Sequence, residues 1–255
     1  MAMTMTGKTT TAGRWAGAAL VGTPLCGVAL SLALKHELAL GGLYVVKCLI
    51  GELVLICLVI RARAQFAPGA ELVVAHLVTL VRAMLVVLLF ALLGESVDAS
   101  IMWAAVFMAS IAAMTDALDG WLARRTGTAS AFGARFDMES DAALIAALAL
   151  LAWYWERAGA WVLLAGAARY VFVLGIFCLR WMRRELPASL RRKVVCVVQV
   201  VALVLCLAPV FSPVVSALCA ALGVAALLGS FLVDTLWLVR ATHPKESEAC
   251  CKALM

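Results

Sequence analysis

About eight long apolar segments, separated by short polar stretches, limit this chain to one kind of fold. Of its 255 residues, 65% are hydrophobic and 14% are charged. A helix needs about 20 apolar residues to cross a bilayer, and lipid offers no partners for backbone polar groups, which favours helices. We predict an all-α polytopic membrane helix bundle, with helices near 14–34, 39–60, 70–93, 100–121, 137–155, 160–180, 194–211 and 214–239. The first apolar run is longer than a signal-peptide core, so we expect an uncleaved span.

The positive charges indicate how these helices are oriented. With the N-terminus in the cytoplasm, sixteen Lys and Arg residues fall in inside loops, and only Lys35 and Arg157 fall outside. The positive-inside rule then predicts that both chain ends and the loop between the fourth and fifth helices are cytoplasmic. The net charge of +6 reports this topology, so we do not expect nucleic-acid binding.

Four aspartates gather where the fourth predicted helix ends and the fifth begins. Asp116 and Asp119 are three residues apart, and Asp137 and Asp141 are four apart, so each pair lies on one helix face. A carboxylate in the hydrocarbon core costs roughly 2.5–3.5 kcal/mol, so four of them indicate a function. Oxygen ligands without His or Cys favour magnesium, manganese or calcium over zinc.

Small and basic residues complete this stretch. Gly120 follows Asp116 by four residues and Gly133 precedes Asp137 by four, so both leave room for a ligand or a neighbouring helix. Arg124 adds a guanidinium group suited to phosphate. Carboxylate-held metal, open backbone and a guanidinium together suit a substrate that carries a pyrophosphate.

The stretch resembles the signature of the CDP-alcohol phosphotransferase family, D-x-x-D-G-x-x-A-R-x8-G-x-x-x-D-x-x-x-D, at every fixed position. The resemblance implies transfer of a substituted phosphate from a CDP-linked donor to an alcohol hydroxyl, with release of CMP. It implies two divalent ions, Mg²⁺ or Mn²⁺, held by the four aspartates, and makes Asp141 the general base as well. The residues that would border the CDP group are Gly120, Ala123, Arg124 and Gly133.

A second, looser resemblance concerns the acceptor. The stretch His76-x-x-Thr79-x-x-Arg82 is similar to the N-x-x-T-x-x-R stretch of bacterial phosphatidylglycerophosphate synthases, with His76 in place of Asn. Arg82 would either point inward toward an anionic headgroup or extend to the membrane interface. Lys193 and Gln199 also resemble a lysine and a glutamine of those enzymes.

Several other charges lie within or beside the predicted helices. Arg169 follows four small residues, so we expect it to face the bundle interior and to pair with an aspartate or a lipid phosphate. Lys47 and Glu52 are interpreted as a helix-face pair or as interfacial charges, with substrate handling as the alternative. For Glu139 we favour a local ion pair with Arg135. Asp234 is left out of the site as part of an interfacial anchor.

The charged, proline-containing stretch at 61–69 suggests a boundary between a two-span addition and a six-span core. We predict an N-terminal tail and two-span addition at 1–67, a catalytic core at 68–240 and a mobile cytoplasmic tail at 241–255.

The predicted substrates are CDP-diacylglycerol as the lipid donor and a small alcohol, with glycerol 3-phosphate preferred, as the acceptor. The alternatives are a CDP-aminoalcohol donor with diacylglycerol as acceptor, a cation transporter, and a scaffold without catalysis. The family resemblance also implies a bacterial cytoplasmic (inner) membrane and allows a homodimer, although no interface can be recognised in the sequence.

Overall fold

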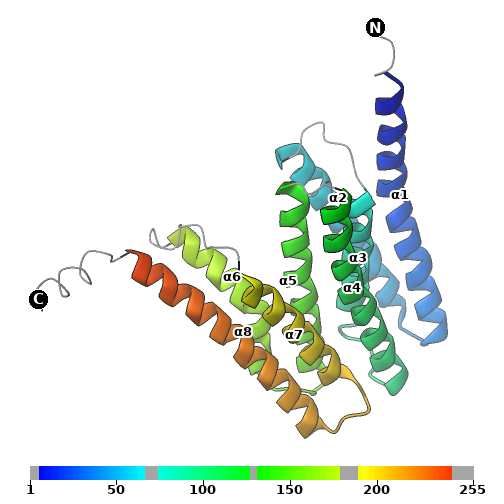
Figure 1. The fold of residues 1–255 in the computed structure, drawn as a ribbon. Helices are drawn as coiled ribbons and strands as arrows, with labels where there is room; N and C mark the ends of the chain where they lie inside the picture. Colours follow the sequence, from blue (N-terminus) through cyan, green and yellow to red (C-terminus); the bar gives the residue numbers. More distant parts are fainter. Residues whose placement is uncertain (1–5, 67–73, 127–130, 179–188, 243–255) are drawn as a thin grey trace, which may run out of the picture.

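The computed structural model describes the backbone of residues 6–66, 74–126, 131–178 and 189–242, and side chains within 22–61, 78–115, 136–175, 178 and 189–239. Every regular element in these ranges is helical (Figure 1). The elements are α1 (Thr6–Glu37), α2 (Gly42–Phe66), α3 (Val74–Ala91), α4 (Ala99–Thr126), α5 (Ala131–Tyr154), the short 3₁₀ helix η1 (Ala160–Val162), α6 (Leu163–Cys178), α7 (Leu190–Leu207) and α8 (Pro213–Thr242). The predicted all-α bundle is confirmed.

The composition of the helices agrees with a membrane protein. Within the described residues, Gly42–Arg61 and Pro213–Val239 are long and apolar enough to cross a bilayer. Shorter apolar helical stretches are Val78–Ala91, Ala99–Thr115 and Ala160–Gly175. Large apolar side chains also point outward, among them Leu43, Leu190 and Leu222. Such surfaces suit lipid, because lipid tails are as apolar as leucine.

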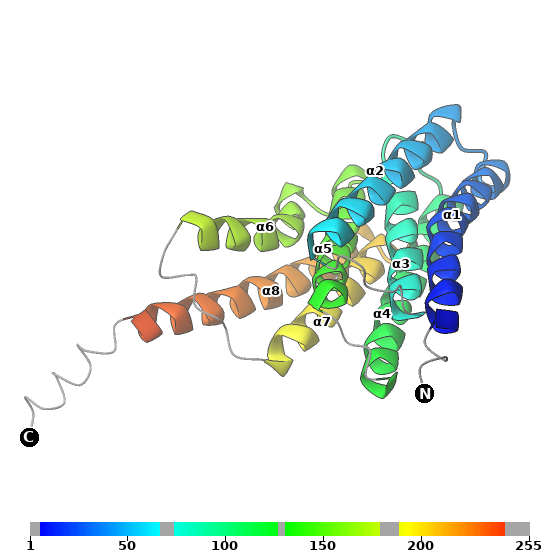
Figure 2. The same cartoon turned by 90° about the horizontal axis from the view of Figure 1, so that it is seen from above.

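The bundle is built around α3, α4 and α5. Figures 1 and 2 show α1 at one edge, α6 and α8 at the other, and α3 to α5 between them. Helix α3 packs against α4, α5, α1 and α2, while α7 packs mainly against α8. Three fully buried alanines on α4, Ala105, Ala109 and Ala112, allow close helix packing. By the bounds of these helices, the first half of the aspartate motif lies on α4 and the second half lies at the start of α5.

A polar contact ties the α1–α2 turn to the α3–α4 turn. Lys47 Nζ donates to Glu95 Oε1 and to the Leu93 carbonyl oxygen, each at 2.7 Å. The Gly41 N–H donates to Glu95 Oε2 at 2.9 Å. The predicted pair between Lys47 and Glu52 does not form. Glu52 is buried, at 3% exposure, and Lys47 lies near the start of α2, where it reaches Glu95 in the α3–α4 turn.

Arg157 stabilises the region just after α5, at the end of that helix far from the aspartate motif. It donates to carbonyl oxygens where α7 ends, those of Cys206 at 3.2 Å and Ala208 at 2.8 Å, and to the Phe211 carbonyl oxygen at 2.8 Å. It also donates to Ser216 Oγ at 2.7 Å. The last carbonyls of a helix have no partner within the helix, so Arg157 stabilises the α7–α8 turn.

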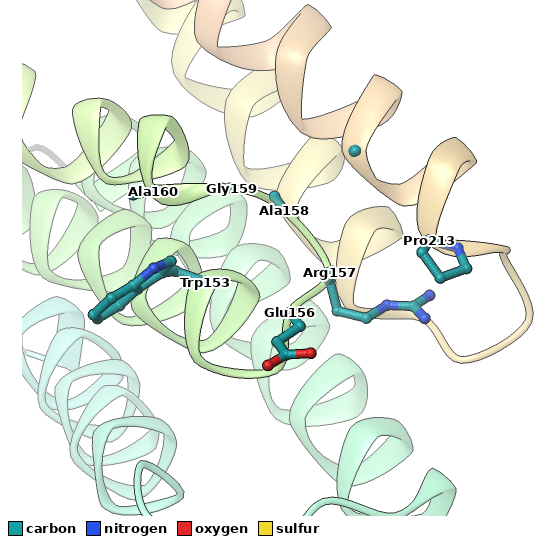
Figure 3. Close-up of a pocket in the computed structure, with 8 residues that line it drawn as sticks. Trp153, Glu156, Arg157, Ala158, Gly159, Ala160 and Pro213 are labelled. Carbon is teal, nitrogen blue, oxygen red and sulfur yellow. The ribbon is translucent and has the colours of Figure 1, made fainter.

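A shallow hollow of about 400 Å³ lies at this same end, lined in part by Trp153, Glu156 and Gly159. Figure 3 shows Arg157 extending past it toward Pro213. The hollow is roughly 20 Å along α5 from Asp141, given the helical rise per residue. It is therefore separate from the aspartate motif.

Candidate active site

The aspartate motif occupies the facing ends of α4 and α5. The backbone of Asp116, Asp119, Gly120, Ala123 and Arg124 continues α4 to its end at Thr126. Gly133 lies in the first turn of α5, followed on the same helix by Asp137 and Asp141. The side chains of the motif before Phe136 lie outside the described residues, so the geometry below concerns its second half.

Asp137 and Asp141 meet one guanidinium group from α3. Arg82 Nη2 lies 2.5 Å from Asp137 Oδ1, and Arg82 Nη1 lies 3.2 Å from Asp141 Oδ1. Arg82 Nη2 also donates to the Asp137 carbonyl oxygen, and Nε donates to Ser140 Oγ, each at 3.2 Å. Of the two orientations considered for Arg82, the structure therefore shows the inward one.

The three charged groups differ in exposure. The Arg82 side chain is fully buried, at 0% exposure, whereas Asp137 and Asp141 are 39% and 28% exposed. The buried guanidinium thus places a positive charge directly beside both carboxylates. Both aspartates thus face outward on one side of α5, with the Arg82 guanidinium behind them.

Arg169 reaches the same helix from α6. Its Nη2 lies 2.7 Å from Glu139 Oε1. Arg169 was expected to pair with an aspartate or a lipid phosphate; within the described side chains its partner is Glu139. Arg169 Nε is buried and has no hydrogen-bond partner in this part of the chain. Arg135, the local partner favoured for Glu139, has a side chain outside the described residues.

The remaining candidates are spread over α3 and α7. Thr79 is buried on α3, one turn before Arg82. Lys193 is exposed near the start of α7. Gln199 is fully buried, and neither of its amide atoms has a hydrogen-bond partner among the described residues. The structure thus brings Arg82 to the aspartates and does not bring Lys193 into a described contact with them.

Two polar contacts were missed in the sequence. Ser140 accepts a bond from Arg82, and its place three residues after Asp137 is the signal that could have identified it. Asp234 is bound by Arg191 at 2.5 Å, and Arg191 also donates to Ser230 Oγ at 2.9 Å. This second cluster joins α7 to α8, which gives Asp234 a structural partner.

Comparison with known families connects this geometry to a reaction. A family model described as CDP-alcohol phosphatidyltransferase matches residues 72–231, from just before α3 into α8. The chain belongs to the CDP-alcohol phosphatidyltransferase family. It is therefore a transferase that moves a phosphatidyl group from a CDP-alcohol to an alcohol, in a membrane setting. No curated protein and no solved structure matches the chain.

CDP-alcohol phosphatidyltransferases use divalent metal ions, and the described residues fit such an ion chemically. Asp137 and Asp141 supply hard oxygen donors one helical turn apart, and both are partly exposed. No group of three His, Cys, Asp or Glu converges within the described side chains, which exclude Asp116 and Asp119. The metal ligands among the aspartates therefore remain a prediction.

Proposed function

We propose that this CDP-alcohol phosphatidyltransferase transfers the phosphatidyl group of CDP-diacylglycerol to a small phosphorylated alcohol, with glycerol 3-phosphate preferred. The reaction would take place at the cytoplasmic face of a bacterial inner membrane. The observation that carries the proposal is the position of Arg169. Its Nε has no hydrogen-bond partner among the described residues, and its Nη2 is bound to Glu139, which lies two residues from each aspartate of α5 and therefore on a different face of that helix.

Arg169 supports a phosphorylated acceptor for a physical reason. A buried N–H without a partner is uncommon and unfavourable in folded proteins. A phosphate oxygen of the acceptor could accept this bond, with the guanidinium charge strengthening it. Because Glu139 already holds the Nη2 side of Arg169, the group is oriented before the acceptor arrives.

Asp141 would act as the general base. As the acceptor oxygen attacks the donor phosphorus, a new O–P bond forms and the bond from phosphorus to CMP breaks. The hydroxyl proton passes to the Asp141 carboxylate, an effect typically worth 10²–10⁴-fold. Its 28% exposed side chain is open to a substrate, and Arg82 restricts its orientation.

The other signature residues would bind the donor. Asp116, Asp119, Asp137 and Asp141 would hold the divalent cations, Mg²⁺ or Mn²⁺. When bound, these ions would neutralise the pyrophosphate and stabilise the leaving CMP. The residues bordering CDP would be Gly120, Ala123, Arg124 and Gly133.

One experiment tests the substrates directly. Purified protein is given labelled CDP-diacylglycerol with glycerol 3-phosphate, inositol phosphate, serine or inositol, and the lipid products are identified. We expect a product with glycerol 3-phosphate. A product only with serine or inositol, which carry no phosphate, would contradict the proposal of a phosphorylated acceptor. Turnover only with a CDP-aminoalcohol and diacylglycerol would contradict the proposed donor.

Three measurements test the residue roles. Asp141→Asn should abolish CMP release in a protein that still folds and inserts, and chelator should stop wild-type turnover until Mg²⁺ or Mn²⁺ is restored. Arg169→Met should raise KM for glycerol 3-phosphate at least tenfold, because a charged bond to phosphate is lost. Glu156→Gln, an exposed position just beyond the far end of α5, is the control and should behave as the wild type.

A further inference from the structure

Arg82 binds three side chains along one turn of α5. Its Nη2, Nε and Nη1 reach Asp137, Ser140 and Asp141, at 2.5, 3.2 and 3.2 Å respectively. Only the planar guanidinium presents donors in this fixed fork. A lysine ammonium at the same position could not reach all three acceptors in one geometry.

The location of Arg82 separates it from the substrates. Its side chain is fully buried, whereas both carboxylates are partly exposed, so the guanidinium lies behind them as seen from the surface. A soluble acceptor or a cation approaching from the surface meets Asp137 and Asp141 first. Direct contact between Arg82 and the acceptor phosphate is therefore disfavoured by this arrangement.

The charges have a further consequence. Arg82 attracts both carboxylates and offsets their mutual repulsion when no cation is bound. A divalent cation on the same carboxylates would be repelled by Arg82. By linkage, the contribution of Arg82 to stability is larger in the cation-free protein than in the cation-bound protein.

We propose that Arg82 is a positioning residue that orients Asp137 and Asp141 while limiting how tightly they bind the divalent cation. This inference rests on the proposed function, in which these aspartates hold the cation. It predicts opposite changes in two quantities that usually fall together, cation affinity and turnover rate. Removing Arg82 should tighten cation binding and slow turnover.

The test uses full-length protein in detergent micelles at about pH 8, where carboxylates are ionised. Mn²⁺ binding is followed by electron paramagnetic resonance of free Mn²⁺, and turnover by CMP release. For Arg82→Met we expect the Mn²⁺ dissociation constant to fall about tenfold, because a nearby like charge is removed. We expect kcat to fall at least tenfold and KM for the acceptor to change less than twofold.

Arg82→Lys distinguishes charge from geometry. It keeps the positive charge but loses the fork, so Mn²⁺ affinity should stay near the wild-type value while kcat falls. If Arg82→Met does not fold, Arg82→Lys decides alone, and wild-type kcat in that variant overturns the proposal. Lys47→Met removes one charge near the other end of α3 and should leave Mn²⁺ affinity unchanged.

The remaining outcomes are also decisive. Unchanged or weaker Mn²⁺ binding by folded Arg82→Met overturns the proposal, as does a raised acceptor KM with unchanged Mn²⁺ affinity, which would make Arg82 an acceptor contact. If the wild type binds no Mn²⁺ and works in chelator, the proposed function itself fails. If the wild type binds Mn²⁺ and needs it for turnover, but the Arg82 variants have the same Mn²⁺ affinity and kcat as the wild type, this inference alone fails.

Discussion

Replacing Arg157 tests whether one side chain holds the α7–α8 turn. The change is Arg157→Met, which keeps much of the side-chain volume and removes every donor. Three of the four acceptors that would lose their bonds belong to buried residues: the carbonyls of Cys206 and Ala208 and the hydroxyl of Ser216. A hydrogen bond to a charged group contributes about 1.5–3 kcal/mol. The Ser216 hydroxyl can rotate toward another partner, whereas the two buried carbonyls cannot. Arg157 is itself only part-buried, so we take the lower figure for these two carbonyls and expect a loss of about 3 kcal/mol.

This loss can be measured as a shift in thermal unfolding. For a chain of this size, 1 kcal/mol corresponds to about 2–4 °C, so the melting temperature in detergent should fall by about 6–12 °C. Turnover at low temperature should stay near normal, because the turn is far from Asp141 along α5. Arg157→Lys should give an intermediate shift, and the exposed neighbour variant Glu156→Gln should give none. A melting temperature for Arg157→Met within 2 °C of the wild type would refute the reasoning.

Three further predictions concern helix contacts, each measured by thermal unfolding in detergent. Gly166→Val should destabilise the protein by about 1–3 kcal/mol, because even a Cβ there would lie 3.0 Å from the α5 backbone; a stability equal to wild type would show that α6 can move away freely. Asp234→Asn should destabilise by about 2 kcal/mol by weakening the charged bond from Arg191, and no change would exclude this bond as a support of α7 on α8. Glu95→Gln should destabilise by about 1 kcal/mol at neutral pH. Burial alone would raise the pKa of Glu95, but bonds from Lys47 and a backbone N–H hold it below its ordinary value. The stabilisation is therefore present above the ordinary pKa and lost as pH falls through the lower folded value, so the variant and the wild type should converge in acid and not at neutral pH.

The apolar runs predicted the helices well because lipid leaves the backbone one way to satisfy its polar groups. The ends of the helices were harder to predict. Helix α5 begins at Ala131, before the predicted start at 137, because a helix can extend beyond the apolar run that a count of apolar residues finds. The charges of Asp137 and Glu139, within the predicted range, are bound by Arg82 and Arg169 from neighbouring helices.

The site could be predicted only as far as local spacing reaches. The spacing of Asp137 and Asp141 correctly placed both carboxylates on one helix, and the structure shows both at one guanidinium. The partner itself lies on α3, 55 residues from Asp137, and an inward or outward Arg82 is compatible with the same sequence. For the same reason, Glu139 pairs with Arg169 on α6, which no local rule indicates. The roles of the first half of the motif stay predictions.

The attachment of α1 and α2 to α3 has a consequence for the independence of these two helices. They cover a surface of α3 that lipid could cover equally well, so burial there provides little driving force. Close fit matters instead: a Cβ at Gly27 on α1 would lie 3.1 Å from Met84 Cγ of α3, and one at Gly51 on α2 would lie 2.5 Å from Val87 Cγ1 of α3. The Glu95 contact and the buried side chains of Tyr44 and Cys48 add to this fit. An added methyl group at Gly51 would therefore push α2 away from α3, while the helix that carries Arg82 keeps its remaining neighbours.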